Sequence, residues 1–208
     1  MVEQERFDVV VVGAGNAALC AAMSALEQGA SVLVLEKAPE HLRGGNSYFT
    51  GGLFRFAYEG MDDISDLIPT ITDDEKITVD VGAYPSNSFY SDVMRVTEGL
   101  SNPEMLQILV SKSFSTMLWM RDQGVHWILA YGRQAFRHEG KLTFWGGLTV
   151  ESVGGGKGLS DRQFELVGDR ANVVYETKAT RLLANDQGRV VGLTIQGPNG
   201  QRDISCGA

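Results

Sequence analysis

The chain has 208 residues, of which 43% are hydrophobic, and this content supports a folded domain rather than a disordered segment. Its formal net charge is −8, and no block of five like charges appears in the sequence. Nucleic acid and anionic membrane surfaces are therefore poor partners for it.

The N-terminal stretch MVEQERF is charged, and no stretch approaches 18 consecutive apolar residues. The two cysteines, Cys20 and Cys206, stand in contexts that suggest neither a disulfide framework nor a metal site. We therefore expect a cytoplasmic protein that has no metal ion and is not inserted into a membrane.

Glycine is over-represented, with 25 residues, about twice the usual share of roughly 7%. The clusters lie at Gly13/Gly15, Gly44/Gly45, Gly51/Gly52, Gly146/Gly147 and Gly154–Gly158. Glycine lets another molecule approach the backbone, so repeated clusters indicate a large ligand that is touched at several points. Ordinary turns and helix ends are the alternative for any single cluster.

The first forty residues predict a strand, a glycine turn, a helix and a second strand. Residues 7–12 (FDVVVV) form an unbroken apolar run, which is typical of a parallel strand buried on both faces. A helix of strong helix formers follows and ends at Gly29. Residues 31–35 then predict a second buried strand, which ends at Glu36.

This order is the one that a dinucleotide-binding fingerprint requires. Gly13 permits the tight turn, Gly15 lets the backbone reach a diphosphate, and Ala18 allows the helix to pack closely on the strand. The N-terminus of the helix offers N–H groups and partial positive charge to the diphosphate, and Glu36 is placed to accept hydrogen bonds from a ribose. NAD and FAD folds share this opening, so it does not choose between them.

The segment GGNSYFTGG, residues 44–52, favours FAD. With it the sequence resembles the flavoprotein family of fumarate reductases and succinate dehydrogenases, and within that family the tricarballylate dehydrogenase branch. The stretches that carry the resemblance are GAGNAALCAAMSALEQGASVLVLEKAP, RGGNSYFTGGLFRFAYEG, AYGRQAFR and FWGGLTVESVGGGKGLSD. A nicotinamide-binding protein without flavin is the remaining alternative at this point.

The resemblance implies a set of residues that contact FAD. These are Gly13, Gly15, Asn16, Ala17, Ala18, Glu36, Lys37, Gly45, Asn46, Ser47, Thr50, Gly51, Gly52 and Ala179. The first five would hold the diphosphate, Glu36 the adenosine ribose, a backbone amide near Ala179 the adenine, and the residues from Gly45 to Gly52 the diphosphate and the flavin ring. Where membrane succinate dehydrogenases carry a flavin-linked histidine this sequence has Asn46, so FAD is expected to be bound without a covalent bond.

The middle of the chain predicts helices over residues 62–67 and 86–97, and a long helix from an Asn102 N-cap to Gly124. In the long helix, apolar side chains recur at helical spacing and predict a core-facing stripe. The stripe consists of Leu106, Leu109, Val110, Phe114, Met117 and Met120.

Two later segments allow more than one interpretation. Tyr131, Arg133, Arg137 and His138 can clamp carboxylates, but a solvated loop with an ion pair to Glu139 is the favoured interpretation. The glycines of 154–158 either approach the flavin or the substrate, or form only a turn between the strand-like TVESV and a short helix in SDRQFELVGDR.

The last part of the chain predicts a strand and a three-stranded antiparallel meander, with turns at residues 186–188 and 198–200. We expect an α/β fold: a Rossmann-like parallel sheet of the FAD/NAD(P)-binding type with a helical insertion and a β-meander, in an incomplete domain. Residues 1–208 would form the N-terminal portion of an FAD-binding domain, with 53–147 as a largely helical insertion and 172–206 as a strand plus the meander.

The resemblance implies a flavoprotein oxidoreductase that dehydrogenates a small polycarboxylate, with tricarballylate to cis-aconitate as the expected reaction and an unidentified electron acceptor. The alternatives are fumarate or succinate chemistry, 3-ketosteroid dehydrogenation, and an FAD-binding fragment without activity of its own. Catalytic residues are expected beyond Ala208.

Overall fold

The computed structural model describes residues 5–144 and 146–208. The chain divides into two compact units. The first unit comprises the residues up to Thr50 together with Lys157–Ala208, and the second unit comprises Gly51–Gly156.

The first unit contains the predicted parallel sheet, in the order β10-β3-β2. Its strands are β2 (Val9–Val12), β3 (Val32–Leu35) and β10 (Asn172–Val174), and both pairings are parallel. All four residues of the central strand β3 are buried, as an unbroken apolar run predicts. The parallel-sheet prediction is thus confirmed.

The predicted strand 7–12 is wrong as one element, because it is split at Asp8. The Asp8 carboxylate accepts hydrogen bonds from the Ser31 amide (2.8 Å) and hydroxyl (2.7 Å), and these bonds interrupt the strand. The residues before Asp8 form β1 (Arg6–Phe7), which pairs with the last strand of the chain in a different sheet.

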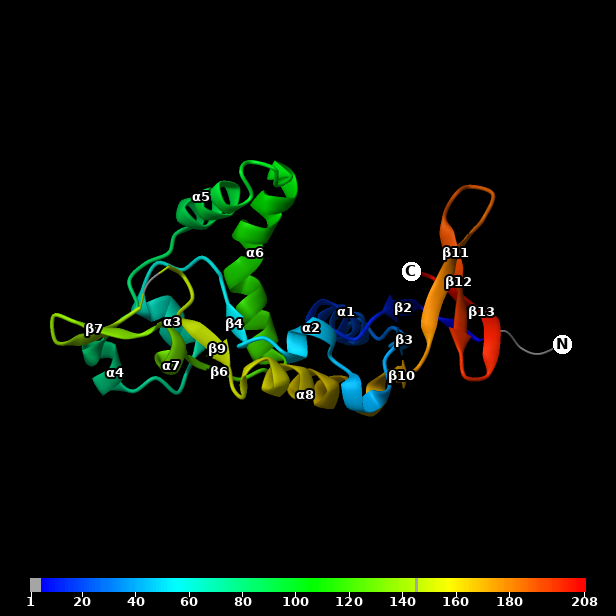
Figure 1. Cartoon of the computed structure of the whole chain (residues 1–208), viewed down its shortest axis with the longest axis horizontal. Coiled ribbons are helices and arrows are strands. Elements are labelled where there is room, and N and C mark those ends of the chain that lie inside the picture. Colours follow the sequence, from blue (N-terminus) through cyan, green and yellow to red (C-terminus); the bar gives the residue numbers. More distant parts are fainter. Residues whose placement is uncertain (1–4, 145) are drawn as a thin grey trace. The chain divides into compact units, whose positions relative to one another are not determined.

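That second sheet is the predicted meander, drawn in orange to red in Figure 1. It consists of β11 (Lys178–Ala184), β12 (Val190–Gly197) and β13 (Gly200–Cys206), with β1 added in parallel beside β13. Side chains from the two sheets share one buried cluster, formed by Leu33, Leu35, Leu193, Ile195 and Ile204. The meander is therefore fastened to the parallel sheet by apolar packing.

The helices of the first unit include the predicted helix after β2 and a helix after the glycine run that begins earlier than predicted. They are α1 (Asn16–Glu27), η1 (Glu40–Leu42), α2 (Gly45–Tyr48), α8 (Gly155–Val167) and η2 (Gly168–Arg170), with the unit boundary after Gly156. The predicted short helix after the glycine run is wrong in its start, because α8 already begins at Gly155. The glycines from Gly155 to Gly158 thus lie inside the helix and not in a separate turn.

The second unit contains five helices and two small sheets among its described residues (Figure 1). The helices are α3 (Met61–Leu67), α4 (Asp73–Thr78), α5 (Ser86–Val96), α6 (Pro103–Asp122) and α7 (Tyr131–Gln134). One sheet has the order β4-β9-β6, with β4 (Leu53–Phe54), β9 (Val150–Ser152) and β6 (Trp127–Leu129). The other has the order β5-β8-β7, with β5 (Val79–Asp80), β8 (Lys141–Thr143) and β7 (Phe136–His138).

Helix α6 begins as predicted, since the Asn102 side chain accepts a hydrogen bond from the Met105 amide at 3.0 Å. Its core stripe is only partly correct. Leu109 is 52% exposed, and the buried position beside the stripe belongs to Ser113, whose hydroxyl accepts from the Ala57 amide. Phe114 is half-buried and stacks on Phe56.

Among the described residues, no helix combines the length and the apolar character that a membrane-spanning helix needs.

Candidate cofactor-binding site

The turn between β2 and α1 opens the N-terminus of α1 at the carboxyl end of the parallel strands. Gly13 has a positive φ of +100°, which side chains rarely tolerate, and its amide donates to the Leu35 carbonyl at 2.7 Å. Gly15 is the extended N-cap of α1. Val12, the last residue of β2, is 58% exposed, and only Val11 of this strand is buried, so the expected burial on both faces holds for β3 but not for β2. This geometry presents the first N–H groups of α1 to an anion.

Glu36 lies at the end of β3 and is only 7% exposed. One oxygen of its carboxylate accepts from the Ala14 amide at 3.0 Å, and the other accepts from the Ala38 amide at 2.8 Å. Each carboxylate oxygen has a second acceptor site, so the side chain can still accept a hydroxyl hydrogen bond. Lys37 beside it is exposed.

The segment that begins at Gly44 lies directly against the start of α1. The Ser47 hydroxyl accepts a hydrogen bond from the Asn16 amide at 3.1 Å. A Cβ atom placed on Gly15 would lie 3.5 Å from the Ser47 hydroxyl and 3.7 Å from the Gly44 carbonyl. The two motifs, which are separated by 31 residues in the sequence, therefore meet at one place in the fold.

The other predicted contacts of this segment have varied surroundings. Gly45 and Asn46 are exposed on α2, and the Thr50 hydroxyl donates to the Ser47 carbonyl at 2.9 Å, at the end of that short helix. Ala17 and Ala18 are exposed and half-buried in the first turn of α1. Ala179 lies in β11 opposite Ile195, next to an irregularity in the strand pairing.

Helix α8 supplies two polar side chains that the sequence did not single out. The Ser160 hydroxyl lies where a Cβ on Gly44 would be, so Gly44 is required for this packing. Gln163 is fully buried, and its amide nitrogen donates to the Asn16 side-chain oxygen at 2.8 Å and to the Cys20 sulfur at 3.3 Å. The sequence contained a signal for both residues, because they are polar and lie on the otherwise apolar face of α8. Unpaired polar groups on a buried face are costly, so such residues are expected to have hydrogen-bond partners.

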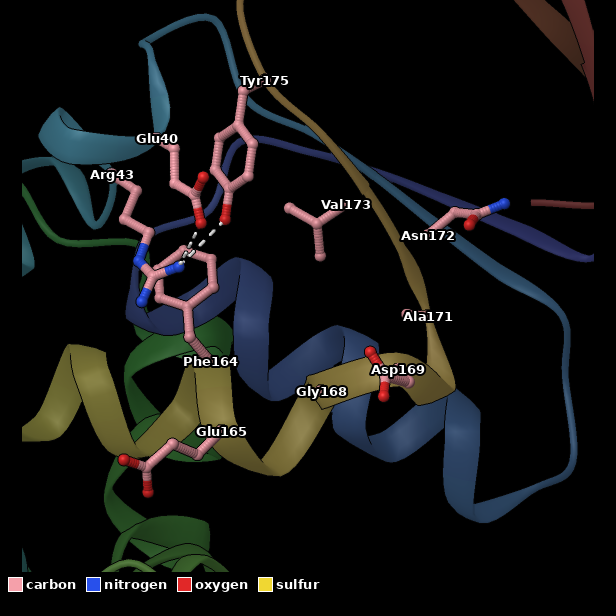
Figure 2. A pocket seen from close by; sticks show the side chains of 10 residues that line it. All are labelled: Glu40, Arg43, Phe164, Glu165, Gly168, Asp169, Ala171, Asn172, Val173 and Tyr175. Carbon is pink, nitrogen blue, oxygen red and sulfur yellow. Dashed lines mark hydrogen bonds and ion pairs between the residues drawn. The ribbon is translucent and has the colours of Figure 1, made fainter.

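The residues just before this segment line a pocket of about 460 Å³ in the first unit (Figure 2). Arg43, which precedes Gly44, places its guanidinium 4.2 Å from the centre of the Phe164 ring. The same guanidinium donates to the Glu40 carboxylate at 3.2 Å and to the Tyr175 hydroxyl at 3.3 Å. These contacts fix the chain just before the glycine pair.

In the second unit, Gly51 and Gly52 are packed against protein atoms. The Gly52 carbonyl accepts from the Ser152 amide at 2.9 Å, and a Cβ on Gly52 would lie 2.4 Å from the Ser152 hydroxyl and 2.6 Å from the Gly155 carbonyl carbon. A Cβ on Gly51 would lie 2.9 Å from an Arg133 guanidinium nitrogen. Protein atoms therefore fill the space beside both glycines, with flexible side-chain ends at Gly51 and the Gly155 backbone at Gly52.

The charged residues near α7 form pairs within the second unit. His138 and Glu139 lie 3.8 Å apart, which is the ion pair expected for a solvated segment, and Arg137 is exposed. Arg133 lies 3.4 Å from the Glu151 carboxylate. The Tyr131 hydroxyl donates to Glu75 at 2.8 Å, and burial together with this carboxylate raises the pKa of Tyr131. The segment is not a plain loop, since it contains α7 and β7.

The described residues contain no group of three or more His, Cys, Asp and Glu that could hold a metal ion. Both cysteines are free thiols. Burial raises the pKa of Cys20 to about 11, so this thiol stays protonated at neutral pH.

The donor set at the start of α1 fits a nucleotide diphosphate. It combines a glycine turn, the N-terminus of a twelve-residue helix and a hydroxyl from a second segment, while a buried carboxylate stands at the end of the neighbouring strand. The chemistry of these groups therefore agrees with FAD as the ligand.

Similar proteins include two reductases. The chain is 25% identical over 198 residues to fumarate reductase (cytochrome) from Shewanella frigidimarina, covering 91% of this chain but only 30% of that protein. It is 33% identical over 117 residues to digoxin reductase from Eggerthella lenta, covering 56% of this chain and 18% of that protein. The chain thus spans about a third or less of the length of these relatives.

Solved structures confirm the fold. A flavocytochrome c3 fumarate reductase in its open conformation matches with a TM-score of 0.70 at 23% identity, over 97% of this chain and 32% of that one. The 3-ketosteroid-Δ4-(5α)-dehydrogenase of Rhodococcus jostii RHA1 also matches with a TM-score of 0.70, at 19% identity, over 99% of this chain and 45% of that one. The family described as FAD binding domain matches residues 8–208, and the chain therefore belongs to this family of FAD-binding proteins.

Proposed function

We propose that FAD is bound with its diphosphate at the N-terminus of α1. Gly13, Gly15 and Asn16, followed by Ala17 and Ala18, would hold the diphosphate. The observation that carries this proposal is the hydrogen bond from the Asn16 amide to the Ser47 hydroxyl, because it joins the two motifs that the FAD assignment requires. The helix end supplies donors and partial positive charge for the phosphates without any basic side chain.

The rest of the cofactor follows from this placement. Glu36 would accept hydrogen bonds from the adenosine ribose with its remaining acceptor sites, and Lys37 and Ala179 would lie near the adenosine. Gly45 and Asn46 with Ser47 and Thr50 would contact the diphosphate and the flavin. The assignment of Gly51 and Gly52 to the flavin ring stays a prediction from the resemblance.

We further propose that the whole protein is a cytoplasmic flavoprotein oxidoreductase acting on a carbon–carbon bond of a small polycarboxylate, with tricarballylate as its substrate and a separate electron acceptor. Bound FAD supplies a two-electron acceptor for such chemistry. The residues of this chain bind and orient the cofactor, and none of the described residues is assigned a proton transfer. The chain would be the N-terminal portion of an FAD-binding domain, with 53–147 as its insertion and 172–206 as a strand plus the β-meander.

A second candidate is a reductase or dehydrogenase for fumarate, succinate or a 3-ketosteroid. The observations that favour it are the 25% identity over 198 residues to a fumarate reductase and the 48% identity over 48 residues to a 3-oxosteroid 1-dehydrogenase, whereas the TM-score of 0.70 is the same for both kinds of enzyme. The fold alone therefore does not distinguish these substrate classes.

The test is a titration of the chain with FAD, together with anaerobic addition of tricarballylate, succinate or a 3-ketosteroid to the whole protein with bound FAD. We expect FAD to bind and to be released on denaturation, since no covalent bond is proposed. Bleaching of the flavin by tricarballylate alone supports the first substrate class, and bleaching by one of the others supports the second candidate. A preparation that binds NADH but not FAD contradicts the cofactor assignment.

A further inference from the structure

We propose that Gln163 is a positioning residue for the cofactor: it fixes the side-chain amide of Asn16 so that the Asn16 NH₂ group faces the FAD diphosphate. The proposal rests on the placement of the diphosphate at the N-terminus of α1. It assigns to α8 a role in the site that neither glycine motif indicates.

The contact is short and fully buried. Gln163 has no exposed surface, and its side-chain nitrogen donates to the Asn16 side-chain oxygen at 2.8 Å and to the Cys20 sulfur at 3.3 Å. The Cys20 thiol also points a weak hydrogen bond at the same Asn16 oxygen, at 3.8 Å. The Asn16 oxygen is thus occupied from two directions inside the protein.

The opposite orientation of the two amides is disfavoured by the hydrogen bonds it would lose. In the observed arrangement the two amides leave one buried atom without a partner, the Gln163 side-chain oxygen. If both amides were turned round, the Gln163 nitrogen would lose its acceptors, and two N–H donors would be buried unpaired. Burying two donors costs more than burying one acceptor, so the observed orientation is the stable one.

The consequence for the diphosphate follows from the position of Asn16 at the first turn of α1. The backbone amide of Asn16 is already used by the Ser47 hydroxyl, so it is not available to a phosphate oxygen. With its oxygen held by Gln163, the Asn16 side chain turns its two N–H donors away from α8. The side-chain amide therefore replaces the backbone donor that Ser47 removes.

The decisive variant is Gln163→Glu. An ionised carboxylate can only accept hydrogen bonds, so it draws the Asn16 nitrogen toward α8 and turns the Asn16 oxygen toward the phosphates. Near pH 8 we expect the FAD dissociation constant, measured by quenching of flavin fluorescence, to rise by about tenfold or more. As the pH falls and the carboxyl gains a proton it can donate again, and the affinity should recover. Cys20 stays a neutral thiol across this range, because its pKa is raised to about 11.

A double-mutant cycle with Asn16→Ala separates positioning from packing. In the Asn16→Ala background, Gln163→Glu should leave the FAD affinity unchanged, because no side-chain amide remains to be turned. Equal affinity losses in both backgrounds, or no pH dependence of the loss, overturn the proposal. If Gln163→Glu does not fold, Gln163→Met decides by the same cycle, since it keeps the length and removes the hydrogen bonds.

Gly15→Val distinguishes a failure of this inference from a failure of the proposed site. If Gly15→Val leaves FAD affinity intact in a folded chain, the diphosphate lies elsewhere and both proposals are wrong. If Gly15→Val abolishes FAD binding while Gln163→Glu binds FAD as tightly as the unmodified chain, both near pH 8 and at a pH low enough to protonate the carboxyl, only the role of Gln163 is wrong.

Discussion

The glycines of the turn before α1 and two glycines of the second unit, Gly52 and Gly147, belong to two different classes. A Cβ on Gly13 would touch nothing within 4 Å, and a Cβ on Gly15 would make only ordinary contacts. A Cβ on Gly52 would collide with Ser152 and with the backbone of Gly155, and one on Gly147 would collide with the Tyr84 ring. Similar glycines in the sequence thus have open surroundings at one place in the fold and are packed against protein atoms at another.

This difference separates two quantities that a glycine substitution can change. Where the space beside the glycine is open and φ is not positive, as at Gly15, a side chain is tolerated by the fold but would stand in the way of a ligand at the start of α1. Where the space is filled by protein atoms, the free energy of unfolding falls whether or not a ligand binds. The following substitutions test this division.

The largest effect is expected from Gly15→Val. Its backbone is in an extended conformation that valine can adopt, so the fold should persist. The branched side chain would fill the approach to the start of α1, and FAD affinity should fall by about 1000-fold or more, about 4 kcal/mol. Fluorescence titration gives the affinity, and circular dichroism confirms folding. An unfolded variant would show that the fold itself requires Gly15, and the division of the glycines into two classes would be wrong.

Gly52→Ala should destabilise the chain by about 3 kcal/mol in urea unfolding, because the methyl group collides with backbone atoms and the residue has a φ of +71°. The collision involves the Gly155 backbone, which cannot move aside as a flexible side chain can. A loss below about 1 kcal/mol would show that the segment adjusts and that Gly52 is not a packing glycine.

Gly188→Ala isolates the conformational part of that loss. Gly188 lies in the β11–β12 hairpin with a φ of +75°, and a Cβ there would meet nothing within 4 Å. Only the left-handed backbone penalises alanine, so a loss of about 1 kcal/mol is expected. The difference between the Gly52 and Gly188 variants then measures the collision. Equal losses would mean that backbone conformation explains both.

The smallest effect, with the opposite sign, is expected from Gly132→Ala. Gly132 lies in α7, its φ is not positive, and its surroundings are open. Alanine reduces the conformational freedom of the unfolded chain, so the free energy of unfolding should rise by about 0.5 kcal/mol. A decrease in thermal stability would contradict the description of this glycine as unconstrained.

The sequence predicted the elements whose signals are local. The unbroken apolar run of β3, the glycine turn at Gly13 and the Asn102 cap each depend on a few adjacent residues, and each is present in the structure. The hairpin turns of the meander are of the same kind, with Gly188 and Gly200 both at positive φ. These features could be predicted because neighbouring residues alone decide them.

The elements that were missed depend on distant partners. Strands β4 and β6 have two and three residues and both pair with β9, for example Leu53 with Glu151, so neither is long enough to show a periodic pattern. Leu109 matches the helical spacing of the α6 stripe but is half exposed. Helical spacing identifies a face, and the tertiary fold decides how much of that face is covered.

The candidate site shows the same limit. Gly13, Gly15 and Glu36 were predicted from one local fingerprint, whereas Gln163 reaches Asn16 across 147 positions of the sequence. No local pattern predicts that contact. The available signal was a glutamine on the apolar face of α8, which indicates a buried hydrogen bond but does not name its partner.

The two backbone hydrogen bonds of Glu36 have a thermodynamic consequence. Its carboxylate ties the loop before α1, through Ala14, to the loop after β3, through Ala38. These two hydrogen bonds restrain both loops within the fold, so much of the loops' conformational entropy is lost during folding rather than during association. We therefore expect the entropy change of FAD binding to carry little contribution from loop ordering. Replacing Glu36 to accept a different nucleotide would also remove this order.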